Sequence, residues 1–401
     1  MHILIVADGR SPITQNWINM VNGLGWRVSL VSTFPCEKVA GAELAGVLPV
    51  GFSALGGGQV KITGEKGGWK RQAINRYRLL FLSMRAILAP LLLGRYQKRF
   101  TKIVDGLKPD VVHALRLPFE GMLAESTPLS IPLVVSIWGN DLTFHAHTSP
   151  LMAMHTRRTL KRADGLLADA SRDVVLARQW GLRESVPTLV VPGNGGLDLE
   201  AMRNVLKEKV LPFLLPKGRP ILVNPRGFRP GSVNQDVFFK SLPLVLEKIP
   251  AAFFVCTAMQ GQPQAERWVD DLKLGEYVLL LPYLPQEQLW RLYSRAQVYV
   301  SLSSHDGTPN TFLEALACGC FPVVGDIASL REWLTNGVNG LLVDPREPRK
   351  AADAMIKAVT DESLHLSTLK KNYEMIQKRA EISGIRKEFN AFIKMIKKRS
   401  N

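Results

Sequence analysis

Apolar segments of strand length alternate with amphipathic segments along most of the chain. HILIVA (2–7) is a continuous apolar run, and NWINMVNGLG (16–25) has helical spacing and ends at a glycine. The apolar runs PDVVHAL and PLVVSIW come later, each with a helical or loop segment after it. Strands that are apolar throughout are buried on both faces, and strands separated by helices pair in parallel. The first part of the chain therefore predicts a parallel sheet with helices on both faces.

A segment rich in glycine and proline, LVVPGNGGLDLEAM, interrupts this alternation. Glycine and proline are the strongest breaks in a pattern of strands and helices, so we place a domain boundary here. A second alternating series follows, from PILVNP through QVYVSLS to GLLVD, and the tail is mostly amphipathic helix. Two such domains side by side leave a cleft, and ligands of parallel sheets bind beyond the carboxyl ends of the strands.

The segment SSHDGTPNTFLEALACGCFPVV (303–324) has the features of a ligand-binding turn. It follows the strand QVYVSLS, so Asp306 and Gly307 fall at the carboxyl end of that strand. Thr308 is a suitable helix N-cap, and Pro309 suits the first helical position, where its missing N–H has no cost. We therefore expect a helix that begins at Pro309.

The start of this helix predicts an anion site. The free amides near Asn310 and Thr311 and the positive end of the helix dipole both favour a phosphate group. Carboxylates of Asp306 and Glu314, on either side of those amides, can accept hydrogen bonds from hydroxyls. A sugar nucleotide has hydroxyls at both ends and phosphates between them, so it fits this order of groups. The alternative is that Thr311 and Glu314 form only a capping box.

A longer set of motifs surrounds these residues. It reads Asp306-Gly307-Thr308-Pro309, then a second acid eight residues after the first, Ala317-Cys318-Gly319, an apolar strand and Gly337-Val338-Asn339-Gly340. This set resembles the retaining glycosyltransferases of the GT-B fold, family 4. DVVHALRLPFEGMLA, VVPGNGGLDLEAM and ILVNPRGFRP also look like segments of that family, so the resemblance covers most of the chain.

The resemblance implies a fold and an activity. The fold is α/β, with two Rossmann-like parallel-sheet domains that face each other across a cleft. Residues 1–195 bind the acceptor, residues 196–375 bind the nucleotide sugar, and an amphipathic helix, 376–401, returns to the first domain. The activity is transfer of a sugar from a nucleotide-diphosphate donor to an acceptor hydroxyl, with retention of configuration. Enzymes of this kind generally need no metal, so we expect no cofactor.

The family pattern assigns roles to individual residues. The catalytic candidates are Asp306, Glu314, Arg226 and Asp141. The candidates for binding the donor are Gly139, Arg226, Arg229, Asp306, Gly307, Thr308, Pro309, Asn310, Thr311 and Glu314. The candidates for binding the acceptor are Arg10, Ser11, His113 and His145. Arg226 matches phosphate oxygens bidentately.

Structural roles remain open for three of these residues. Arg226 can be a solvated loop arginine, Asp141 can form an Asx turn or a helix cap, and His113 can be a hydrogen-bonded histidine at a strand end.

The chain departs from the family at three places. Aspartate stands at position 306, where the family has the longer glutamate. The family usually has a lysine several residues after the arginine, but here none occurs before Lys240, and Arg229 is the candidate substitute. Trp138-Gly139 stands where family members often have histidine and glycine, so proton transfer from that position is excluded.

Charge suggests an anionic partner. The net charge is +16, and residues 66–104 contain no Asp or Glu among many Lys and Arg. Such a basic, apolar, helical stretch can lie on an anionic membrane surface, or it can be a core helix with solvated arginines. The first alternative predicts a glycan or lipid-linked acceptor, as in synthesis of envelope polysaccharide or glycolipid.

Other classes of protein receive less support. No RNA- or DNA-binding motif occurs, so we expect no nucleic acid partner. His145 and His147 lack a third ligand cluster, and Asp270-Asp271 lies in a helical context, so no metal site is predicted. A sugar-nucleotide epimerase or phosphorylase on the same fold remains an alternative, as does a basic membrane- or nucleic-acid-binding scaffold.

The N-terminal strand, the lack of a long apolar run and the unpaired cysteine spacing lead us to expect a cytoplasmic protein, either free or peripheral on the inner face of the membrane.

Overall fold

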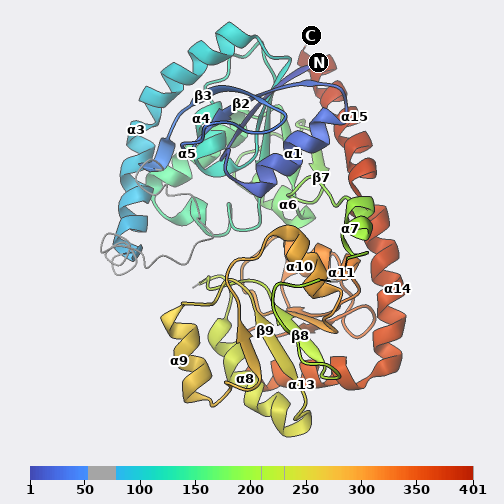
Figure 1. Cartoon of the computed structure of the whole chain (residues 1–401). Coiled ribbons are helices and arrows are strands. Elements are labelled where there is room, and N and C mark those ends of the chain that lie inside the picture. The colour runs from blue at the N-terminus through green and yellow to red at the C-terminus, as the bar shows by residue number, and fades with distance from the viewer. Residues whose placement is uncertain (53–77, 209, 230, 401) are drawn as a thin grey trace. The chain divides into compact units, whose positions relative to one another are not determined.

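The computed structural model describes residues 1–52, 78–208, 210–229 and 231–400 (Figure 1). The chain divides into two compact units. The first unit comprises residues 1–196 and 383–401, and the second comprises residues 197–382. Each unit contains one parallel sheet, as the sequence predicts.

The first unit has a seven-stranded parallel sheet in the order β3-β2-β1-β4-β5-β6-β7. Its strands are β1 (His2–Ala7), β2 (Arg27–Ser32), β3 (Glu43–Val47), β4 (Val111–Ala114), β5 (Leu133–Ile137), β6 (Gly165–Ala168) and β7 (Thr188–Val190). Its α-helices are α1 (Pro12–Asn22), α3 (Arg78–Leu107), α4 (Met122–Ala124), α5 (Pro150–Arg162), α6 (Ser171–Gln179) and α15 (Ile382–Ser400). Short helical turns are η1 (Val50–Phe52), η2 (Leu117–Gly121) and η3 (His145–His147).

The second unit has a six-stranded parallel sheet in the order β10-β9-β8-β11-β12-β13. Its strands are β8 (Ile221–Asn224), β9 (Phe253–Cys256), β10 (Val278–Leu280), β11 (Val298–Ser301), β12 (Phe321–Gly325) and β13 (Leu341–Val343). Its helices are α7 (Leu199–Val205), α8 (Gln235–Lys248), α9 (Pro263–Asp271), α10 (Gln286–Tyr293), α11 (Asn310–Ala317), α12 (Ala328–Arg331), α13 (Pro348–Thr360) and α14 (Glu362–Arg379).

Both faces of the second sheet are buried. Leu222 of β8 packs into one apolar core, while Val223 packs into the core on the other face. On β11, Val300 packs into the same core as Leu222, and Tyr299 packs into the same core as Val223. Successive side chains of a strand point to opposite faces, which explains why these strands carry no polar stripe.

The strand orders fix where each sheet can bind a ligand. In each unit, the first three strands lie in order on one side of the sheet, and the fourth strand pairs with the free edge of the first. This reversal lies between β1 and β4 in the first unit and between β8 and β11 in the second. Loops that follow such neighbouring strands separate in opposite directions and leave a crevice at their carboxyl ends. Arg226 follows β8 and Asp306 follows β11, so both lie at the switch point of the second sheet.

The C-terminal helix α15 packs onto the first unit. Phe389 is fully buried and its ring lies 5.3 Å from that of Trp17 and 5.7 Å from that of His113. Lys397 pairs with Asp110, which immediately precedes β4. The amphipathic pattern of the tail thus supplies an apolar face that covers the first sheet.

Some element boundaries differ from the sequence expectation. α1 begins at Pro12, before the predicted segment, because the Ser11 side chain caps it by accepting from the amide of Ile13. α8 runs through Pro243 as one helix. The expected domain boundary at residue 375 falls inside α14, whereas the division lies at the start of α15. α14 stays with the second unit because buried Asn372 bonds to the loop after α12.

Candidate functional site

A buried amide network holds the loop after β8. The Asn224 side-chain amide donates to Gln235 Oε1 at 2.7 Å, and Gln235 Nε2 donates to the Gly227 carbonyl at 2.7 Å. Gly227 has φ of 62°, a left-handed conformation that favours glycine, and a Cβ there would lie 3.1 Å from Ala258 Cβ. Together these contacts fix the backbone on both sides of Arg226.

The second loop, between β11 and α11, is held by the α12 region. Ser329 Oγ donates to the Asp306 carbonyl at 2.9 Å, and Trp333 Nε1 donates to Thr308 Oγ1 at 3.0 Å. The prediction that Thr308 caps the helix is therefore wrong, because its hydroxyl bonds to Trp333 and the N-cap position is Pro309. No side chain that the structure describes caps α11, which leaves its first amides free for an anion.

These two loops bring Arg226 and Asp306 into an ion pair. The Arg226 side chain is 7% exposed, and its Nη1 lies 3.4 Å from Thr311 Oγ1. Burial is the largest single effect and lowers the pKa of Arg226, but the Asp306 carboxylate, Tyr299 and Tyr293 together outweigh it, and the net pKa of Arg226 is raised. The guanidinium is therefore charged at every accessible pH and lies at the start of α11.

Arg229 adds a second cation. The nearby Arg226 charge, followed by burial, lowers the pKa of Arg229. Tyr283, in the loop after β10, is also close enough to influence it. Two guanidinium groups thus lie within electrostatic reach of one carboxylate at this edge of the sheet.

Glu314 lies within α11 and is 4% exposed. Its Oε1 accepts a hydrogen bond of 2.7 Å from Nε2 of Gln286, at the start of α10. Burial raises the pKa of Glu314 from 4.5 to about 7. Near neutral pH both its forms are present, so this carboxyl can accept from a ligand hydroxyl or donate to one.

The raised pKa of Glu314 predicts a pH dependence of stability. The folded chain keeps this proton between about pH 4.5 and about pH 7, where the unfolded chain loses it. The contribution to stability is complete below pH 4.5 and is lost as the pH rises through 7. We expect it to amount to roughly 3 kcal/mol, and Glu314→Gln should abolish it. Urea unfolding at pH 5 and pH 8 measures the difference in the free energy of unfolding. The control is Glu276→Gln, at an exposed position. An equal change in unfolding free energy with pH in the parent and in Glu314→Gln would refute the assignment.

In the first unit, Asp141 holds a turn and an arginine. Its carboxylate accepts from Arg116 Nε at 2.9 Å and from the Trp138 amide at 3.1 Å. Asp141 is 0% exposed, so in this structure no ligand hydroxyl can reach it. Arg116, which sequence reasoning missed, also bonds to Asn140 and lies over the Trp138 ring. Its position directly after the strand PDVVHAL was the available signal. Gly139 is buried, and its carbonyl accepts from Arg172.

The acceptor candidates do not form one cluster. His113 is 0% exposed and its Nε2 lies 2.9 Å from Ser136 Oγ, so its ring offers a ligand no surface here. Burial lowers its pKa to about 3. Arg10 pairs with Asp8 after β1, Ser11 caps α1, and His145 begins η3. Of these, Arg10 follows β1 and so lies near the switch point of the first sheet.

A second polar group at the carboxyl edge of the first sheet was not predicted. Asp173 lies beside Asp169 and Arg172, and Arg172 Nη2 donates to Asp173 at 2.7 Å. Burial raises the pKa of Asp173. Asp169, Arg172 and Asp173 are close together in the sequence directly after β6, and that position was the available signal.

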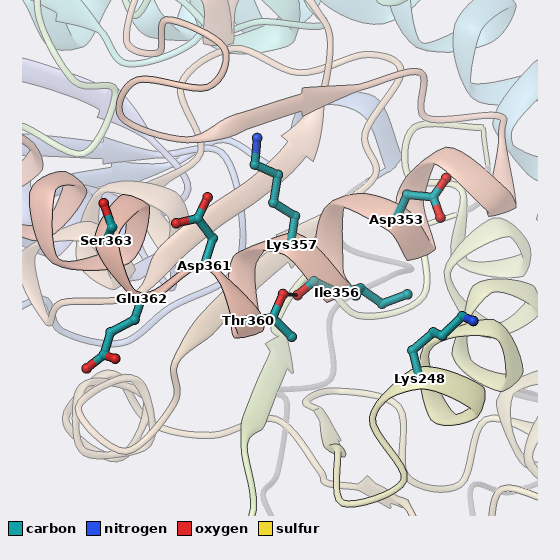
Figure 2. A pocket seen from close by; sticks show the side chains of 8 residues that line it. All are labelled: Lys248, Asp353, Ile356, Lys357, Thr360, Asp361, Glu362 and Ser363. Atoms are coloured by element: carbon teal, nitrogen blue, oxygen red, sulfur yellow. Dashed lines mark hydrogen bonds between the residues drawn. The ribbon is translucent and has the colours of Figure 1, made fainter.

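The surface depression shown in Figure 2 lies elsewhere on the second unit. It has a volume of about 800 Å³ and is lined by Lys248, Asp353, Ile356, Lys357, Thr360, Asp361, Glu362 and Ser363. These residues come from the ends of α8 and α13 and the start of α14, at the amino edge of the sheet. The depression is therefore at the opposite edge from Arg226 and Asp306.

Two kinds of feature are absent from the described residues. No group of three or more His, Cys, Asp or Glu side chains has an arrangement that holds a metal ion. None of the described helices combines the length and apolar character needed to cross a membrane.

Comparison with known proteins places this site in context. The glycosyl transferases group 1 family model matches residues 212–381, nearly all of the second unit. A D-inositol 3-phosphate glycosyltransferase from Catenulispora acidiphila is 30% identical over 284 residues, which are 65% of this chain and 66% of that protein. A D-inositol 3-phosphate glycosyltransferase from Frankia alni is 35% identical over 85 residues, 21% of each chain.

Solved structures match along almost the whole chain. Sucrose-phosphate synthase from Thermosynechococcus elongatus has a TM-score of 0.72 at 16% identity and covers 99% of both chains. Anabaena HepE in complex with UDP-glucose has a TM-score of 0.65 at 15% identity and covers 98% of this chain and all of the other. At these identities the likeness shows the fold, and the expected GT-B fold is confirmed.

Fold and family match define the class of this protein as a glycosyltransferase. The match to the glycosyl transferases group 1 model covers most of the second unit and less than half of the chain.

Proposed function

We propose that the protein transfers a sugar from a nucleotide-diphosphate donor to an acceptor hydroxyl, with retention of the anomeric configuration. The second unit binds the donor. Arg226, Arg229 and the first amides of α11 hold the diphosphate, and Glu314 holds hydroxyls at one end of the ligand. Asp306 lies at the other end, where the sugar is attached. This assignment of roles follows the family 4 pattern.

The observation that carries the proposal is the position of Arg226. The Arg226 guanidinium is buried and permanently charged. It lies at the switch point of a parallel sheet, beside the start of a helix that no described side chain caps. Sugar transfer with retention needs a stabilised diphosphate leaving group more than a strong base. Fixed positive groups at that point supply this stabilisation without reorganising during the reaction.

A panel of nucleotide sugars tests the proposal. Purified full-length protein is screened by thermal shift with UDP-, GDP- and ADP-sugars, and the stabilising donors are then assayed for hydrolysis and transfer. We expect at least one donor to be turned over, and both Asp306→Ala and Glu314→Ala to lower that turnover. Absence of turnover with every donor, together with unchanged ligand binding in both variants, would favour a scaffold. Interconversion of the donor sugar without release of the nucleotide would identify an epimerase.

The acceptor is proposed to be lipid-linked, with the protein on an anionic membrane surface at the cytoplasmic face. Much of the basic segment, including Arg76 and Arg78, lies outside the residues whose side chains the structure describes. The described part of α3 exposes Leu91 by 63% and Leu92 by 46%. Exposed cations follow at helical spacing on the same helix: Arg95, Lys98, Arg99 and Lys102. Exposed leucines beside cations suit a lipid interface.

Vesicle binding tests this surface. The double variant Lys98→Glu/Arg99→Glu should weaken partition onto vesicles that contain phosphatidylglycerol by at least about tenfold, since each cation near such a surface contributes about 1 kcal/mol. The matched control is Lys370→Glu/Lys371→Glu, with the same charge change on exposed positions of α14. Partition that does not depend on the phosphatidylglycerol content, or that is equally weakened in the control, would contradict the proposal.

A further inference from the structure

We propose that Asp306 is a displaceable counter-ion, which holds the Arg226 guanidinium in place when no phosphate is bound and competes with phosphate for it. The inference rests on the proposed diphosphate site. It gives Asp306 a function that is separate from contact with a sugar hydroxyl.

The contacts of Asp306 support this function. Its carboxylate pairs with Arg226 Nη2 and accepts from the Gly307 amide at 3.1 Å and from Ser303 Oγ at 3.4 Å. Ser303 is fully buried beneath the loop. The carboxylate is therefore directed toward the arginine by its own loop.

Arg226 keeps binding capacity for a further anion. Its Nε–H is buried without a hydrogen-bond partner among the described residues, and its Nη1 contact with Thr311 is long, at 3.4 Å. A guanidinium has five N–H donors, and a buried donor without a partner is costly. A bidentate phosphate oxygen pair would satisfy these donors better than the single contact with Asp306 does.

Charge in the site also favours exchange. Arg226 and Arg229 together carry two positive charges against the one carboxylate of Asp306. A diphosphate bound to both arginines would bring negative oxygens next to that carboxylate, and like charges at such separations repel strongly in a partly buried site. Phosphate binding therefore displaces Asp306 from Arg226, and the freed carboxylate becomes available at the sugar end of the ligand.

Inorganic pyrophosphate is the probe, because it contains the phosphates without base or sugar. Calorimetric titration of the full chain should show pyrophosphate binding about tenfold tighter to Asp306→Asn than to the parent, since the variant lacks the competing charge. Asp306→Glu, which keeps the charge, should not gain affinity. Arg226→Ala should bind weakly, and Asp306→Asn should give no gain in that background.

Unchanged or weaker pyrophosphate binding by Asp306→Asn would overturn the inference, provided that thermal unfolding shows the variant folded. A merely structural Asp306 predicts weaker binding, because Arg226 would lose its support. If Asp306→Asn fails to fold, Asp306→Glu is compared with the parent instead, by the salt dependence of pyrophosphate binding. Equal affinity of the two proteins supports the competing charge, and loss of binding by Asp306→Glu contradicts it. Turnover in the donor panel is measured independently of pyrophosphate binding. Failure of the counter-ion proposal can therefore be told apart from failure of the proposed function.

Discussion

Arg226→Ala should lower turnover of the donor identified in the nucleotide-sugar panel by roughly 10²–10³-fold, the usual effect of removing one fixed group that stabilises a developing charge. The guanidinium is 7% exposed and lies between the Asp306 carboxylate and the Thr311 hydroxyl. Its loss also leaves Asp306 facing the diphosphate without its partner. The Asp306 carboxylate would then repel the diphosphate of the donor, which the site attracts when Arg226 is present.

The measurement is kcat and KM for the transfer or hydrolysis reaction, with thermal unfolding to confirm that the variant is folded. Arg267→Ala removes the same charge from an exposed position on α9 and should leave both constants unchanged. Arg226→Lys keeps the charge but not the planar fork, so its turnover should fall between parent and alanine variant. Turnover of Arg226→Ala within threefold of the parent would exclude Arg226 from the diphosphate site.

Phe389→Ala should destabilise the first unit by about 3–5 kcal/mol, as is typical when a large buried aromatic side chain is truncated. Phe389 is 0% exposed and packs against Trp17, Trp26 and His113. It comes from α15, far along the chain from these partners. A cavity at this point therefore weakens the attachment of the C-terminal helix to the sheet.

Thermal unfolding should show a transition lowered by roughly 10 °C, given the usual dependence of melting temperature on free energy for a domain of this size. Limited proteolysis should in parallel cleave the last residues of the variant faster than those of the parent. Lys394→Ala, on the exposed face of the same helix, is the control. Equal melting temperatures and equal cleavage rates would show that α15 is not part of the core of the first unit.

Local sequence determined the parallel sheets of this protein. Apart from His2, strands such as HILIVA and FPVVG are apolar throughout, and only strands buried on both faces favour that composition. The turn around Asp306 was equally predictable, because a strand, a glycine, a proline and a helical run follow each other within a few residues. Position after a strand was enough to place Arg226 and Asp306 at the same edge of the second sheet.

Local sequence was less informative where side chains choose between partners. Thr308 has the chemistry of an N-cap, but Trp333 takes its hydroxyl. Asp141 and His113 have the chemistry of ligand-binding residues, but both are fully buried. Arg116 and Gln286 went unnoticed, because the carboxylates that they bond to come from other loops or helices.

The sequence by itself determined the fold class, the strand that delivers each candidate residue and the chemistry available at the carboxyl edge of the second sheet. Periodicity and turn composition are local properties, and they persist whatever the rest of the chain does. Only the tertiary structure decided that Asp306 neutralises Arg226 and that Gln286 bonds to a buried Glu314. Those pairings depend on distances between residues 80 and 28 positions apart. Such distances are set by the order of the strands and the packing of the helices, which no short segment encodes.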